Sequence, residues 1–195
     1  MKPKFNQLIS SIQQCQICKA GLAHKPKPIF QLHPAAKILI AGQAPGQKAH
    51  DSGIPFDDPS GDRLREWMGI SKECFYDDNK IAILPMGFCF PGRSQSGDLP
   101  PRKECAKEWR QEVLANLPNI ELILVIGMYA MKWHLGSAMQ KNLTETIKAW
   151  EQYMPKVMPL PHPSPRNNIW LSKHPWFEEE VLVKLRKKIK TVLRK

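Results

Sequence analysis

The sequence predicts an α/β fold of three αβα layers with a short, mostly parallel sheet at the centre. Four continuous apolar runs indicate buried strands, because strands covered on both faces lack a polar–apolar alternation. Segments with helical spacing of apolar residues separate these runs, as is typical of parallel sheets. The 195 residues contain no internal repeat and no linker-like break, so we expect a single domain over residues 1–195.

The first half of the chain is expected to supply two of the strands. The expected elements are a helix at 5–18, an extended proline-rich segment at 23–36, a strand at 37–42, a helix at 61–70 and a strand at 80–88. The strand KILIAG ends at a glycine, which favours a turn directly after it.

The second half is expected to supply the other two strands and most of the helical residues. The expected elements are a helix at 102–117, a strand at 121–127, helices at 128–135 and 143–154, a strand at 156–163 and a helix at 176–193. In the first of these helices Trp109, Val113 and Leu117 recur at helical spacing, which predicts one buried face.

The net charge of +11 is unevenly distributed along the chain. Seven Lys and no acid precede Asp51, and residues 184–195 hold seven Lys or Arg and no acid. Because Lys and Arg release condensed counterions from phosphates, nucleic acid is the simplest partner. The alternative is a solvated basic face that only keeps the protein soluble.

No segment of the sequence has the character of a membrane span or an export signal. The longest apolar run is far shorter than a bilayer span, and residues 1–10 lack the apolar centre of a signal peptide. We therefore expect a cytoplasmic protein without membrane contact, and a monomer.

Three loops are expected at the carboxyl ends of strands, where parallel α/β sheets bind ligands. They comprise residues 42–62, 87–92 and 162–167. The first begins with GQAPG, whose glycines permit a tight turn with N–H groups that can hold a developing anion. The third carries a histidine and an arginine among prolines that restrict the backbone. We expect the three loops to form one site.

The motifs GQAPG (42–46), GIPF (53–56) and HPSP (162–165) occur in this order. Together they resemble the motifs of the uracil-DNA glycosylase superfamily, over a stretch from about Cys15 to Asn168. The resemblance is closest to the iron–sulfur-bearing branch, and within it to short bacterial members. It implies that superfamily's αβα fold and a base-excision glycosylase that hydrolyses the N-glycosidic bond of uracil or a related damaged base. The partner would be DNA containing uracil or another lesion. The alternative is a non-catalytic protein that binds a DNA lesion or a single strand.

The resemblance also assigns roles to individual residues. His162 would stabilise negative charge on the departing base, and Phe56 would stack on that base. The residues expected to contact the base are Gly42, Ala44, Phe56, Gly87 and Phe88. The residues expected to bind DNA as a wedge are Ser164, Pro165, Arg166 and Asn167. The alternatives are a core Phe56 and a proline-rich loop with a surface histidine.

The catalytic carboxylate departs from the family pattern. Ala44 stands where the best-known branch has Asp, and Gln43 stands where the iron–sulfur branch has Glu. Gln43 can position a ring or a water molecule but cannot act as a general base. The stretch DDPSGD resembles part of another branch, which makes Asp58 the expected water-activating residue; it can equally be a helix cap. Lesser candidates are Asp51, Asp57, Asp62 and His50.

Base recognition is a second departure from the family. Pro85 stands where the family often has an Asn that reads the edge of uracil, and proline has no donor for a carbonyl. Either the substrate is another deaminated or damaged base, or backbone groups of the turn PMGF (85–88) read the base.

The chain has five cysteines, which is an odd number, and no signal peptide is expected. Both observations argue against a disulfide framework. Cys15 and Cys18 have a common metal-ligand spacing, and Cys89 and Cys105 match the later pair of the iron–sulfur branch. Four thiolates suit a [4Fe–4S] cluster or a structural zinc ion, and the resemblance favours the cluster. The alternative is two ordinary buried thiols plus an exposed pair, and Cys74 is expected to remain free.

Overall fold

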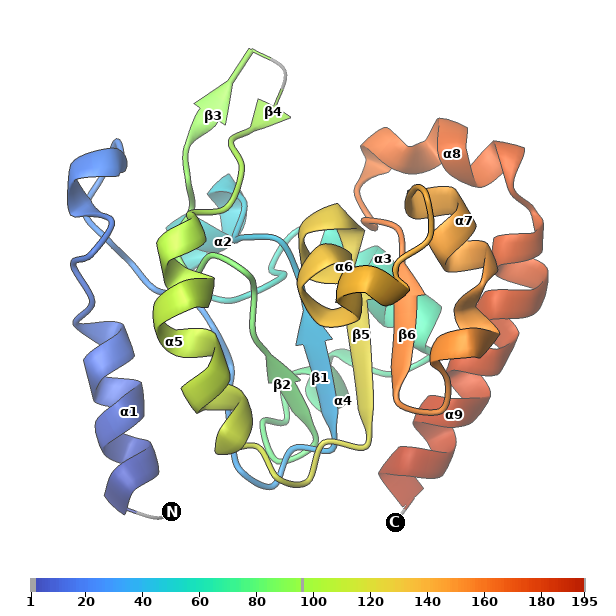
Figure 1. Cartoon of the computed structure of the whole chain (residues 1–195), viewed down its shortest axis with the longest axis horizontal. Helices are drawn as coiled ribbons and strands as arrows, with labels where there is room; N and C mark the ends of the chain where they lie inside the picture. Colours follow the sequence, from blue (N-terminus) through green and yellow to red (C-terminus); the bar gives the residue numbers. More distant parts are fainter. Residues whose placement is uncertain (1–2, 96, 195) are drawn as a thin grey trace.

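The computed structural model describes residues 3–95 and 97–194, which form a four-stranded parallel sheet flanked by helices (Figure 1). The strands are β1 (Ile38–Ala41), β2 (Ile81–Ile83), β5 (Leu122–Ile126) and β6 (Val157–Leu160). They lie in the order β2-β1-β5-β6, with Ile38 of β1 opposite both Ile81 and Leu122. The four predicted strands and their parallel pairing are thus confirmed.

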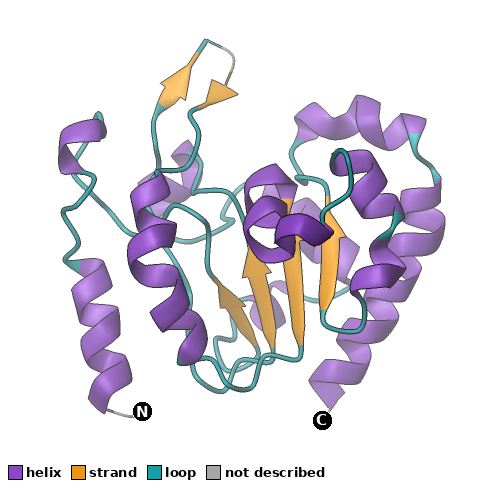
Figure 2. Ribbon diagram, in the orientation of Figure 1, coloured by secondary structure: helices purple, strands orange, loops and turns teal. Residues whose placement is uncertain are grey.

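Helices cover both faces of the sheet and give the predicted three layers (Figure 2). Successive residues of a strand point to opposite faces. Accordingly, Ile38 and Ile40 pack in one core cluster with the helices at 59–68 and 183–194, whereas Leu39 packs in a second cluster with the helices at 3–13 and 103–115. The helices are α1 (Pro3–Gln13), α2 (Gln47–Ser52), α3 (Pro59–Met68), α4 (Lys72–Phe75), α5 (Lys103–Ala115), α6 (Gly127–Leu135), α7 (Leu143–Lys148), α8 (Asn168–Lys173) and α9 (Val183–Arg194).

Several helices differ in extent from the sequence-based expectation. The N-terminal helix ends at Gln13 rather than at Cys18. The helix expected over 143–154 divides into α7 and a 3-10 helix at Trp150–Tyr153, and a π-helical turn at Phe177–Leu182 precedes α9. Within the described part of the chain, no helix is both long and apolar enough to cross a membrane.

The segment 91–101, for which the sequence predicts no strand, contains an antiparallel hairpin. Its strands are β3 (Arg93–Ser94) and β4 (Gly97–Asp98). Strands of two residues are too short for an alternating pattern to reveal them. The hairpin projects beyond the carboxyl edge of the sheet (Figure 1), so it can form one side of a binding site at that edge.

Helix α3 is fixed at both of its ends. Asp58 caps its first turn by accepting a hydrogen bond from the N–H of Gly61 at 2.8 Å, and Pro59 occupies the first position, where no N–H is needed. At the other end Arg186 of α9 donates to the carbonyls of Glu66 and Trp67, at 3.1 and 3.3 Å. The carbonyl of Glu66 also accepts from the N–H of Gly69, so Arg186 adds a second donor there and links α3 to α9.

Candidate active site

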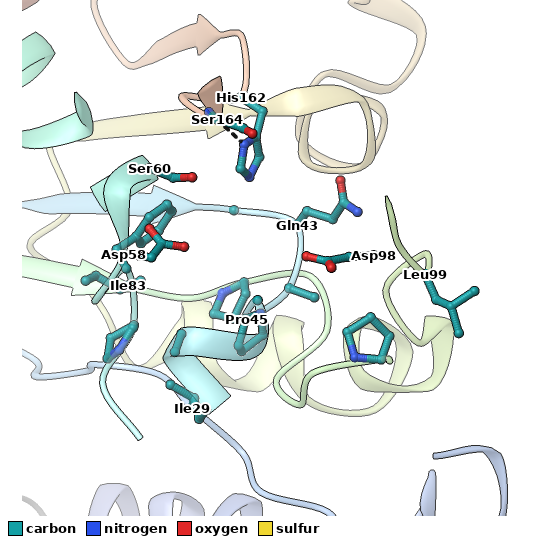
Figure 3. A pocket seen from close by; sticks show the side chains of 18 of the residues that line it. Ile29, Gln43, Pro45, Asp58, Ser60, Ile83, Asp98, Leu99, His162 and Ser164 are labelled. Atoms are coloured by element: carbon teal, nitrogen blue, oxygen red, sulfur yellow. Dashed lines mark hydrogen bonds between the residues drawn. The ribbon is translucent and has the colours of Figure 1, made fainter. Parts of the chain in front are cut away.

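A cavity of about 360 Å³ opens at the carboxyl ends of the strands (Figure 3). Gln43 reaches it from the loop after β1, Pro85 from the segment after β2, and His162 from the loop after β6. The β3–β4 hairpin supplies a further side. The polar lining residues are Gln43, Asp58, Ser60, Arg93, Asp98, His162, Ser164, Arg166 and Asn167. Pro91 of the expected loop 87–92 also lines the cavity, so the three expected loops meet at one place.

Most of the expected site residues line this cavity, but three do not. Those in the lining are Gly42, Gln43, Ala44, Phe56, Asp58, His162, Ser164, Arg166 and Asn167. Those outside it are Gly87, Phe88 and Pro165. The side chain of Phe88 is only 1% exposed and packs in the core with α1 and α5, because the chain turns it toward that face after β2. Phe88 is thus a core residue rather than a base contact.

His162 presents a hydrogen-bond donor to the cavity. Its Nδ1 accepts a hydrogen bond from the N–H of Ser164 at 3.2 Å, so a neutral imidazole carries its proton on Nε2 (Figure 3). Burial lowers the pKa of His162, while Asp58 and Asp98 act in the opposite direction. Because an unperturbed histidine is already mostly neutral at pH 7, the neutral form dominates here. The ring therefore offers an Nε2–H donor without a permanent positive charge.

The loop that carries His162 is held by hydrogen bonds at several points. Asn167 donates to the carbonyl of His162 at 2.6 Å, and the hydroxyl of Ser164 accepts from the N–H of Arg166 at 3.3 Å. Arg63 of α3 donates to the carbonyl of Ser164 at 3.2 Å. The position of His162 is therefore fixed before any ligand binds.

Asp58 caps a helix and also lies in the wall of the cavity. One carboxylate oxygen, Oδ1, is the helix cap described above. The other, Oδ2, lies 3.9 Å from the position that a β-carbon on Gly46 would take, in the wall of the cavity. The lesser candidates lie outside the lining: Asp62 pairs with Arg65, and Asp51 accepts a hydrogen bond from Gln47. Asp57 and His50 are also outside it.

Asp98 is a second carboxylate in the cavity, which sequence reasoning missed. It belongs to β4, and its Oδ1 pairs with Arg93 of β3 at 3.2 Å. Its Oδ2 lies 3.5 Å from the same Gly46 position, so both carboxylates flank the GQAPG turn. No motif marks Asp98, because only the folding of the hairpin brings it to the cavity.

Phe56 has an uncommon backbone conformation at the cavity. Its φ is 56°, and its ring lies edge-on to Phe75 with centroids 6.1 Å apart. A β-carbon on Gly42 would lie 3.4 Å from the tip of the Phe56 ring, so the glycine permits this close packing. A left-handed conformation in a bulky residue costs free energy and is concentrated at functional sites.

Replacing Gly61 with alanine is expected to lower the free energy of unfolding by roughly 1–3 kcal/mol. A β-carbon at Gly61 would overlap the carbonyl oxygen of Phe56, so the backbone would have to move. Urea denaturation measures the effect. The matched control is Gly46→Ala, whose β-carbon would meet neighbours only at 3.5 Å and beyond. Equal stability of Gly61→Ala and the wild type would contradict this account.

The turn after β2 has no free N–H to offer a base. The N–H groups of Met86 and Gly87 donate to the carbonyls of Gly42 and Gln43, at 2.9 and 3.0 Å. The N–H of Phe88 faces Cys105 and lowers the pKa of its thiol, against the larger effect of burial. The N–H groups of Met86 and Gly87 are therefore engaged within the protein rather than open to a base.

The carbonyls of the same turn are held by a buried arginine. Arg110 of α5 is 0% exposed and donates to the carbonyls of Leu84 and Pro85, at 3.3 and 2.9 Å. It also bonds to Nε2 of His134 at 2.8 Å. Burial lowers the pKa of Arg110 to about 9. Burial, followed by the charge of Arg110, lowers the pKa of His134 to about 3, so His134 is a neutral acceptor.

The folded protein is expected to lose stability as the pH falls below about 6.5, and His134 should account for much of the loss. The pKa of His134 is about 3 in the folded protein. Between about pH 3 and about pH 6.5 the unfolded chain therefore binds a proton at His134 that the folded protein does not bind. The free energy of unfolding should then fall by up to about 1.4 kcal/mol per pH unit. His134→Gln keeps an acceptor for Arg110 but cannot titrate. Urea denaturation between pH 7 and about pH 5 should give a shallower pH dependence for this variant, and identical slopes would refute the assignment.

Four of the five cysteines lie near one another. Burial raises the pKa of Cys89 to about 11, and Cys18 and Cys15 add to the rise. Burial raises the pKa of Cys105 to about 12, and Cys18 and Cys89 add to it. Cys74 instead lies beside Lys80 and Asp77. The structure thus separates Cys74 from the four cysteines expected to bind metal.

The donor set of these four cysteines suits thiolate ligation. The backbone N–H of Lys27 acts against burial by lowering the pKa of Cys89, and the N–H of Phe88 does the same for Cys105. N–H groups near a sulfur stabilise its thiolate and tune iron–sulfur sites. Among the residues that the structure describes, however, no three His, Cys, Asp or Glu side chains form a group that could hold a metal ion. The four thiols are close enough to affect one another's pKa values, but they are not arranged as ligands around one metal ion.

Comparison with known proteins gives two findings. The family model of the Uracil DNA glycosylase superfamily matches residues 30–186, which include every polar residue of the cavity lining. A solution NMR structure from Methanosarcina acetivorans, described as a "putative Uracil DNA glycosylase", is similar over 83% of this chain and 98% of that one. The two sequences are 15% identical, and the TM-score is 0.49.

Proposed function

Because the chain belongs to the uracil DNA glycosylase superfamily, we propose that it hydrolyses the N-glycosidic bond of uracil or a related damaged base in DNA. One observation carries the proposal: the neutral Nε2–H donor of His162 and an oxygen of Asp58 line the same cavity. Cleavage of this bond leaves negative charge on the base and positive charge on the sugar. A donor and a carboxylate are the groups that stabilise these two charges.

In the proposed mechanism the target base leaves the duplex and enters the cavity. Phe56 stacks on the base, and His162 donates from Nε2–H to its carbonyl oxygen. As the bond from the sugar C1′ to the base nitrogen breaks, its electron pair moves onto the base. Water adds to C1′ and transfers a proton to Asp58. Atoms and charges balance without a further reactant.

Side chains, rather than backbone groups, would read the base. Within the described residues, the side chains of Gln43 and Ser60 have no hydrogen-bond partner, and both line the cavity. An amide and a hydroxyl can each donate and accept. They would recognise a carbonyl and an N–H on the base edge, which Pro85 cannot do.

Release of a base from DNA tests the proposal directly. The purified protein is incubated with labelled oligonucleotides that contain one uracil, either single-stranded or opposite guanine, and abasic sites are cleaved with alkali. Strand cleavage is the expected result. Intact strands together with a gel shift would favour the alternative, a non-catalytic protein that binds a lesion or a single strand.

We further propose that Cys15, Cys18, Cys89 and Cys105 hold a [4Fe–4S] cluster, with a structural zinc ion as the alternative. Support comes from the proximity of the four thiols and from the N–H groups near Cys89 and Cys105. When bound, the cluster would have a structural role. These residues would then tie the N-terminal segment to the start of α5 and to the chain after β2.

Cys89→Ser is expected to remove the bound metal and to lower the melting temperature, because metal binding contributes folding free energy. Metal analysis and visible absorption measure the first effect, and calorimetry measures the second. Cys74→Ser is the matched control and should retain both properties. A colourless wild-type protein with stoichiometric zinc would favour the zinc alternative. Wild-type protein purified without oxygen that contains neither metal would refute the proposal.

A further inference from the structure

A second concave surface lies beside the cavity, between the start of α5 and α6. This groove has a volume of about 410 Å³, and Met86, Pro101 and Ala106 form its apolar part. The groove adjoins the cavity, because two segments of the chain contribute to the lining of each. Pro85 lines the cavity and the next residue, Met86, lines the groove; likewise Leu99 lines the cavity and Pro101 lines the groove. Figure 1 shows α5 and α6 reaching the edge of the sheet at which the strands end.

Two aromatic side chains line the groove and remain partly open to solvent. Tyr129 and Trp133 of α6 are 39% and 37% exposed. They are four residues apart, so they lie on the same side of the helix, one turn from each other. The guanidinium of Arg110 lies 5.0 Å from the centre of the Trp133 ring and fixes it from the protein side. Rings held open in this way can stack on planar ligands.

Lysines surround these rings. Lys103 and Lys107 lie one turn apart on α5, and Lys132 lies on α6 beside Trp133. In the described part of the chain none of the three forms an ion pair, whereas Arg102 at the same groove pairs with Glu104. Unpaired lysines around exposed aromatic rings give the combination of charge and stacking by which proteins bind unpaired nucleic acid.

We propose that this groove binds an unpaired stretch of the DNA strand whose base occupies the cavity. The strand identity rests on the proposed function, whereas the affinity for unpaired DNA does not. A base in a duplex has both faces covered by its neighbours, so stacking on Tyr129 and Trp133 requires unpaired bases. The lysines would contact the phosphates between those bases, since Lys is a compact cationic donor. Extrusion of a base already unstacks the strand locally.

Binding of a labelled oligodeoxythymidylate, measured by fluorescence anisotropy, tests the groove. Tyr129→Ala should bind about tenfold more weakly than the wild type, because a stacking contact is lost. Tyr129→Phe keeps the ring and should bind like the wild type. The double variant Lys103→Ala/Lys107→Ala should reduce the slope of log affinity against log salt by about 1.4. Circular dichroism checks that each variant is folded.

The matched control is Lys187→Ala/Lys190→Ala, which removes the same charge from exposed positions of α9. The proposal is overturned if Tyr129→Ala binds as tightly as the wild type. It is also overturned if the control weakens binding as much as the groove variant. Because the probe contains no uracil, its binding is independent of base release. If the protein releases no base but its binding of the probe depends on the groove residues, only the proposed function is refuted. If it releases a base and Tyr129→Ala binds the probe as tightly as the wild type, only the proposal for the groove is refuted.

Discussion

Base release by the His162→Ala variant is expected to be about 100 to 1,000 times slower than release by the wild type. The variant loses the Nε2–H donor that would face the carbonyl oxygen of the departing base. A positioned donor in a secluded site stabilises developing charge strongly, because no water replaces it there. Single-turnover assays with a saturating amount of protein measure the chemical step apart from binding. A rate equal to that of the wild type would contradict the mechanism.

The pH dependence of the wild type distinguishes a neutral histidine from a charged one. Burial keeps the pKa of His162 below its ordinary value, so the ring is neutral above about pH 6.5. Base release should therefore not fall on account of this group as the pH rises from about 6.5 to 8. If the wild type loses activity over that pH range and His162→Asn does not, the charged imidazolium is the active form.

Asp58→Asn is expected to slow base release by about 100-fold while leaving the melting temperature nearly unchanged. Asparagine is as good a helix cap as aspartate, so it can still accept the hydrogen bond from Gly61 that begins α3. It cannot take a proton from water. The variant thus separates the two roles of Asp58, and calorimetry together with the release assay measures both.

Two further variants complete this experiment. Asp58→Ala removes the cap as well and should cost about 1 kcal/mol of stability beyond its effect on rate. Asp98→Asn is the matched control, because Asp98 is the other carboxylate beside Gly46. If Asp98→Asn slows release and Asp58→Asn does not, the catalytic carboxylate belongs to the hairpin.

The strands and the convergence of the loops could be predicted because their causes are local. A buried parallel strand must be apolar on both faces, and the carboxyl ends of such strands lie at one edge. His162, Gln43 and Phe56 belong to loops at that edge, so their positions in the chain indicated where they would lie.

The remaining features depend on contacts between distant segments. Asp98 reaches the cavity only through a hairpin with two-residue strands. The direction of Phe88 depends on how the chain turns after β2, which periodicity does not encode. Arg110 occupies the face of an amphipathic helix where an apolar residue is the usual choice, because the carbonyls of Leu84 and Pro85 need a donor there.

Helix α3 connects the two groups that the proposed mechanism requires. It begins at Asp58, and its Arg63 holds the loop of His162, while Arg186 secures its far end against α9. Heating should therefore displace the donor and the carboxylate together rather than one before the other. Enzymatic turnover would then keep accelerating with temperature until α3 melts, and would cease abruptly at that point instead of declining gradually beforehand.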